Sequence, residues 1–138
     1  MATRTGPPIA PVLHRSLLTS LLLITGVMVV LRSGDSGASG TSGNQMLGYA
    51  FSALSFVLVA VALLYLKPRV PARRERQPVE EYWSSVTGTI LPMWFVMEAA
   101  SVLAVVGYFL TGLTVTAVAI AVSIGLFIWY GPKAFVQA

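Results

Sequence analysis

The sequence contains no cysteine, a single histidine and very few charges. Without cysteine the chain cannot form disulfides, thiolate metal sites, iron–sulfur clusters or a cysteine nucleophile. The lone His14 argues against a histidine-ligated metal site or a bis-histidine haem. Charged residues make up 10% of the 138 residues, whereas an average soluble domain has about 25%. So few charges cannot cover a soluble surface, and the composition therefore excludes a typical globular enzyme.

Long apolar runs take the place of those charges. A hydrocarbon core about 30 Å thick needs about 20 residues of helix, and the runs reach or approach this length. The first run, Ser16–Leu31, reaches this length only if Ile9–Leu13 extend it. The side chains of His14 and Arg15, which lie between the two stretches, would then have to reach the membrane interface. No strict alternation suggests a barrel. We predict a single-domain, all-α integral membrane protein with four transmembrane helices at about 9–31, 46–66, 83–110 and 113–130.

The connections predict two antiparallel hairpins. The outer loop 32–45 repeats Ser-Gly four times, which is typical of a flexible linker. The loop 67–81 contains three prolines, which prevent one continuous helix. Between the last two helices, Thr111-Gly112 is expected to end one helix and Thr114 to cap the next. So short a connection makes these two helices antiparallel neighbours.

Basic residues predict the orientation of the bundle. Five of the nine lie in the loop 67–81: Lys67, Arg69, Arg73, Arg74 and Arg76. By the positive-inside rule, this loop and both termini are expected in the cytoplasm, which predicts a multi-pass protein of the cell (inner) membrane. Anionic lipid is a second expected partner of the loop. Nucleic acid is not expected, because Glu75, Glu80 and Glu81 dilute the positive charge.

The first helix has two alternatives to weigh. Its basic start and apolar centre are also typical of a cleaved signal peptide, but the apolar stretch is long and no clear A-x-A site follows. We therefore expect the helix to be retained, and an N-terminus found near Ala38 would contradict this. His14, beside Arg15, is expected to be an interfacial flank rather than a pigment ligand.

Small residues mark the expected contacts between helices, because helices in lipid associate through close packing. Gly48 and Ser52 are candidates in the second helix. The strongest candidates lie at spacings of three or four in the third and fourth helices: Ala100, Ala104, Gly107, Ala117, Ala121 and Gly125.

Glu98 is the one charged residue inside the four apolar runs. A carboxylate there costs roughly 3 kcal/mol on insertion scales, so it needs a role or a partner. No other helix core contains Lys, Arg or His. Ser101 lies on the same helix face, and hydroxyls of other helices are further donors. Glu98 is therefore predicted either to bind a proton or cation, or to hydrogen-bond another helix or subunit.

Residues 46–110 resemble the c subunit (proteolipid) of rotary ATP synthases. Arg76-Gln77-Pro78 is similar to the loop motif of that family, and Glu98 follows Pro78 by twenty residues, near the position of the family's ion-carrying carboxylate. The resemblance implies a helical hairpin in which Glu98 binds H⁺ or Na⁺. The sequence departs from the family in having one glycine in the second helix, a spacing two residues longer, and extra helices on both sides.

Three functions follow from these observations. The first is a non-catalytic structural or accessory subunit of a larger membrane complex or homo-oligomer. The second is a c-like ion-translocating proteolipid, and the third is a small transporter or pigment-associated protein. We expect no enzymatic activity, catalytic residue, metal or cofactor, since the membrane segments offer neither paired acids nor a nucleophile with its base.

Overall fold

The computed structural model describes residues 8–34 and 42–137, and all regular structure within these ranges is helical. The helical class predicted from the sequence is thereby confirmed. Three helical segments are long and apolar enough to cross a membrane: Ile9–Gly34, Gln45–Arg69 and Val79–Thr111. The elements are α1 (Ile9–Gly34), α2 (Ser42–Val61), a π-helical turn (Ala62–Leu66), a 3₁₀ turn (Lys67–Arg69), α3 (Val79–Thr111), α4 (Thr114–Trp129) and α5 (Pro132–Val136).

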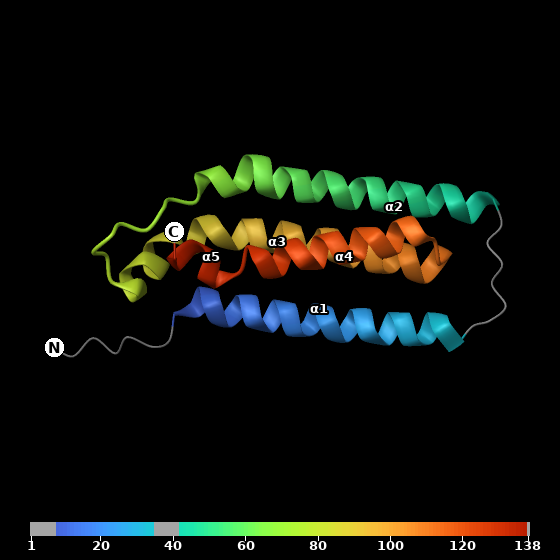
Figure 1. The fold of residues 1–138 in the computed structure, drawn as a ribbon, viewed down its shortest axis with the longest axis horizontal. Coiled ribbons are helices and arrows are strands. Elements are labelled where there is room, and N and C mark those ends of the chain that lie inside the picture. The colour runs from blue at the N-terminus through green and yellow to red at the C-terminus, as the bar shows by residue number, and fades with distance from the viewer. Residues whose placement is uncertain (1–7, 35–41, 138) are drawn as a thin grey trace.

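The long helices run side by side, with α3 at the centre. α1 and α2 lie on opposite sides of the α3–α4 pair, and successive helices are antiparallel (Figure 1). The start of α1, the segment 70–78 and α5 gather at one end of the bundle, which we call the basic end. The tight turn between α3 and α4 lies at the opposite end. α4 has 16 residues, or about 24 Å at about 1.5 Å per residue.

The end of α2 is shaped by Pro68. Proline has no N–H to donate to the carbonyl four residues earlier, and the backbone changes its hydrogen-bond spacing just before it. The N–H of Lys67 donates to Ala62, five residues back. The N–H of Val70 then donates to Lys67 at 3.1 Å, and the chain becomes extended at Val70.

α3 starts earlier than the apolar run suggests. The run begins at Trp83, but α3 begins at Val79, so Glu80 and Glu81 lie in its first turn rather than in the loop. Carboxylates are favoured there by the helix dipole, and the hydropathy pattern hides that preference. α3 also continues through Pro92 to Thr111.

The turn between α3 and α4 is made by two residues. Gly112 has φ +64°, the left-handed conformation that glycine adopts without steric cost, and its N–H donates to Tyr108 at 2.7 Å. The N-cap of α4 is Leu113 and no side chain caps it, so the expected cap by Thr114 is wrong. The hydroxyl of Thr111 instead accepts the Leu113 N–H at 3.4 Å.

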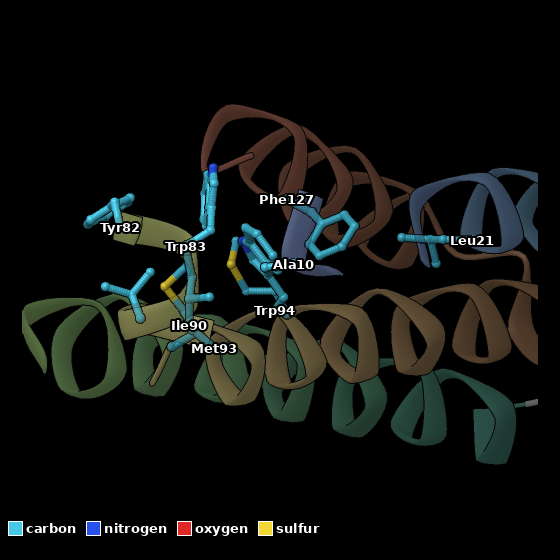
Figure 2. Packing of buried hydrophobic residues seen from close by; sticks show 11 residues of the cluster. Ala10, Leu21, Tyr82, Trp83, Ile90, Met93, Trp94 and Phe127 are labelled. Atoms are coloured by element: carbon cyan, nitrogen blue, oxygen red, sulfur yellow. The ribbon is translucent and has the colours of Figure 1, made fainter. Parts of the chain in front are cut away.

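The aromatic core lies toward the basic end. Trp94 of α3, Phe127 of α4 and Ala10 of α1 lie together in Figure 2 and are fully buried. Trp83 and Tyr82 extend the cluster along α3, with ring centroids 5.3 Å apart. Three helices therefore meet around the indole ring of Trp94. The short helix α5, at the same end of the bundle, was not predicted from the sequence.

Candidate functional site

The end of α4 leaves the backbone carbonyls of Phe127 and Tyr130 without helical partners. Pro132 has no N–H for the Ile128 carbonyl, and the Gly131 N–H takes that acceptor at 3.1 Å. The Phe127 carbonyl, which Gly131 would otherwise satisfy, is left open. Side chains from other helices supply the missing donors. His14 Nε2 lies 3.1 Å from the backbone carbonyl oxygen of Phe127, and Trp94 Nε1 donates to the backbone carbonyl oxygen of Tyr130 at 2.9 Å.

His14 is consequently a core residue. It is 4% exposed, stacks on Phe127 at 4.5 Å and lies 4.7 Å from the ring of Trp94. Because a carbonyl only accepts, Nε2–H is the donor in the bond to Phe127. The expectation of an interfacial flank is wrong, since Ala10, His14 and Leu21 form the buried face of α1. Their spacing of four and seven residues was the available signal.

Glu98 lies at the edge of the buried face of α3. It is half-buried, between exposed Phe95 and Ala99 on one side and buried Met97 and Ser101 on the other. No residue within 8–34 or 42–137 donates a hydrogen bond to its carboxyl group. The Ser101 hydroxyl, predicted to be near it, donates to the Met97 carbonyl at 3.0 Å. The structure therefore does not pair Glu98 with Ser101.

α2 contains two buried serines, Ser52 and Ser55. The hydroxyl of Ser55 donates to the Ala100 carbonyl at 2.8 Å, a hydrogen bond between the two helices. The hydroxyl of Ser52, three residues earlier, is buried with no partner among the described residues. Neither serine therefore hydrogen-bonds the Glu98 carboxyl.

The small residues of α3 lie where helices approach closely. Ala100, Ala104 and Gly107 are buried. A Cβ added to Gly107 would lie 2.7 Å from Phe51 Cβ and 3.3 Å from Thr116 Cγ2. Gly48 of α2 is equally confined, because a Cβ there would be 2.6 Å from a methyl group of Leu113.

The small residues of α4 lie elsewhere. Ala117 is half-buried, Ala121 and Gly125 are exposed, and nothing lies within 4 Å of a Cβ added to Gly125. Within this chain α4 packs through a different set, which the search for small residues missed because it includes larger side chains: Thr116, Ala119, Ser123 and Phe127.

The basic loop is partly ordered by its own arginine. Arg73 donates to the Gln77 carbonyl through Nε at 3.0 Å and Nη2 at 2.8 Å, and to Val136 of α5 at 3.3 Å. Arg69 stacks over Tyr65, and Lys67 Nζ lies 3.4 Å from the Tyr130 hydroxyl. In the c-like motif, Gln77 is half-buried, whereas Arg76 and Pro78 are exposed, as is Arg74.

Arg32 anchors the other end of α1. It lies in the last turn of α1 rather than in a loop, and its Nη1 donates to the Phe109 carbonyl at 3.3 Å. A Cβ added to Gly112 would meet the same guanidinium. A cation near the C-terminus of α3 is favoured by the helix dipole, so Arg32 tethers α1 to the end of α3.

Comparison with known proteins gives no relative: no family model, curated protein or solved structure matches this chain. Among the described residues, no three His, Asp or Glu side chains gather as a metal site would require. Two features remain as candidates for function: the carboxyl of Glu98 at the edge of α3, and the hollowed surface around α5.

Proposed function

We propose that this chain is a small multi-pass membrane protein that serves as a non-catalytic structural subunit of a larger membrane assembly. Three helices have the length and composition of membrane spans, and we propose the shorter apolar helix α4 as the fourth. The excess of arginine and lysine at the basic end, with the start of α1 and α5, supports a cytoplasmic position for this end under the positive-inside rule.

The observation that carries the subunit role is the position of Glu98. Its carboxyl group lies on the border of an open helix face and has no donor among the described residues. A polar group at membrane depth is costly unless it is hydrogen-bonded. A donor from a neighbouring subunit supplies that bond, and no pathway of further acids or bases is needed for it.

The open faces of α1 and α4 support the same role. α1 exposes large apolar side chains along its length, such as Leu23 at 65% and Val30 at 68%. On α4, Ala121 and Gly125 leave a shallow strip of the kind that allows a second helix to approach closely. Lipid covers such faces in isolation, and a partner helix covers them in an assembly.

The test is co-purification of the tagged protein in mild detergent, followed by light scattering. We expect wild type to elute with a partner or as a homo-oligomer. Glu98→Leu should lose this association, Glu98→Gln should retain most of it because the amide still accepts hydrogen bonds, and Glu81→Leu, an exposed acid of the same helix, should behave as wild type. A monomeric wild type, or an intact assembly in Glu98→Leu, would contradict the proposal.

The membrane orientation is tested separately, because the absence of cysteine provides a clean background. Arg74→Cys at the basic end and Thr114→Cys at the opposite end both replace exposed residues. In intact cells we expect an impermeant maleimide to label only Thr114→Cys, and both after lysis. Labelling of Arg74→Cys in intact cells would reverse the orientation.

A second candidate function is a c-like ion carrier. It is favoured by the α2–α3 hairpin, whose loop contains Arg76, Gln77 and Pro78. It is also favoured by Glu98, a half-buried residue near the middle of α3. Dicyclohexylcarbodiimide should then modify Glu98, and the transported ion should protect it. Absence of labelling, or ion transport unaffected by Glu98→Gln, would exclude this role.

A further inference from the structure

A hollow of about 290 Å³ lies between the first turns of α1 and the α4–α5 junction. Its walls include His14, Arg15 and Leu18 from α1, and Trp129, Gly131 and Lys133 from the junction. It exists because the helix is interrupted at Gly131-Pro132, so that α5 does not continue along the axis of α4. His14 at the same time holds α1 against the last turn of α4. The hollow is therefore built by residues of the core and opens at the basic end.

The charge of this hollow has one sign. Arg15 and Lys133 both line it and both are exposed, whereas none of its lining residues is acidic. The two cations come from opposite walls, one from α1 and one from α5. A small anion in the hollow can thus be contacted from two sides, by side chains that are carried on two different helices.

The rest of the lining is apolar and continues outward. Leu18 lies about one turn beyond Arg15 in α1, toward the middle of the bundle, and Ile128 lies in the last turn of α4, before the break that leads to Lys133 in α5. Trp129 is 74% exposed beside them. A second hollow on α1 shares Arg15, and a third on α5 shares Trp129 and Lys133. A cationic mouth above an apolar wall matches a molecule with an anionic head and a hydrocarbon tail.

We infer that the hollow between α1 and α5 binds the phosphate group of an anionic phospholipid, held by Arg15 and Lys133, with an acyl chain along Leu18 and Ile128. Basic pockets between membrane helices on the cytoplasmic side are suited to such headgroups. Arginine offers paired N–H donors to phosphate, and lysine a compact charge. The inference rests on the membrane placement of the chain but not on the subunit role of Glu98.

Native mass spectrometry of the detergent-purified protein tests the site. We expect phosphatidylglycerol to remain bound as a discrete adduct and phosphatidylethanolamine to bind much more weakly. At about 1 kcal/mol for each basic residue, the double variant Arg15→Gln/Lys133→Gln should lose roughly thirtyfold in affinity for phosphatidylglycerol. The matched control Arg74→Gln/Arg76→Gln removes the same charge from exposed positions outside the hollow and should lose less than about threefold.

Each further outcome decides between sources of the phosphate. Displacement of the adduct by millimolar inorganic phosphate would overturn the lipid assignment and indicate a site for free phosphate. Equal losses in the two double variants would overturn the site itself, because diffuse surface charge would then account for binding. Leu18→Gln separates the tail from the head: it should weaken binding of phosphatidylglycerol but not of its short-chain, water-soluble form. Circular dichroism and elution volume establish that each variant is folded.

Discussion

α1 and α3 have the same mean hydropathy but very different surroundings. α3 has buried residues along its whole length, from Tyr82 to Thr111, whereas α1 buries only Ala10, His14 and Leu21. Lipid tails are as apolar as leucine, so hydropathy gives no preference for the centre of a bundle over its rim. The central helix is instead selected by alanine, glycine and serine, which permit close approach, and the outer helix is held by a few polar anchors.

The largest effect should come from filling the close contact of α3. Gly107→Ala adds a Cβ 2.7 Å from Phe51 Cβ, and overpacking of this kind costs about 1–3 kcal/mol. Gly125→Ala adds the same atom in open space on α4 and gains the same helix propensity. SDS-titrated unfolding in mixed micelles should show Gly107→Ala less stable than Gly125→Ala by that amount. Equal stability would mean that close approach does not define the central helix.

The next largest effect concerns the anchor of α1. His14→Leu leaves the buried Phe127 carbonyl without its donor, which should lower the free energy of unfolding by about 1–2 kcal/mol. Thr19→Leu is the matched change, because it replaces a polar residue on the exposed face of α1. It should be neutral in the same titration. If both variants behaved alike, α1 would be held by apolar packing rather than by its histidine.

A smaller effect separates the two serines of α2. Ser55→Ala removes the hydrogen bond to the Ala100 carbonyl, and bonds of this type between membrane helices average about 0.6 kcal/mol. Ser52→Ala removes a buried hydroxyl that has no partner among the described residues, so we expect no loss. A loss from Ser52→Ala as large as that from Ser55→Ala would indicate a partner for Ser52.

The smallest effect should come from the far tether of α1. Arg32→Gln weakens the contact with the Phe109 carbonyl at a solvent-accessible helix end, for which we expect less than about 0.5 kcal/mol. His14 and Arg32 lie about 27 Å apart along α1 at about 1.5 Å per residue, so the losses in the double variant with His14→Leu should add within about 0.5 kcal/mol. A clear departure from additivity would show that the two anchors are coupled.

Composition and apolar runs predicted the helical class, and the prolines and Gly112 predicted where the chain turns. Local rules alone could not assign the faces of helices that are apolar all round. The small residues Ala117, Ala121 and Gly125 have the spacing of a packing face, yet α4 packs through Thr116, Ala119, Ser123 and Phe127.

The hydrogen-bond partner of His14 was likewise hidden from the sequence, because it lies far along the chain. Its acceptor is a carbonyl at Phe127 that is open only because Pro132 lacks an N–H. Glu98 lies within the apolar helix α3, as the sequence predicted, but spacing alone did not place Ser101. Ser101 hydrogen-bonds its own helix, a choice that an i+3 neighbour rule does not foresee.

The hydrogen bond between His14 and Phe127 joins residues 113 positions apart, and this has a consequence for biogenesis. α1 leaves the ribosome before the other described helices, yet the carbonyl that His14 binds belongs to α4, which follows α2 and α3 in the chain. In the membrane placement proposed above, α1 therefore lies in the bilayer without this hydrogen bond until α2, α3 and α4 have followed it. This hydrogen bond is then among the later contacts to form, and a chain stopped before Phe127 would keep the packing of α1 on α3 but lack the bond that holds His14.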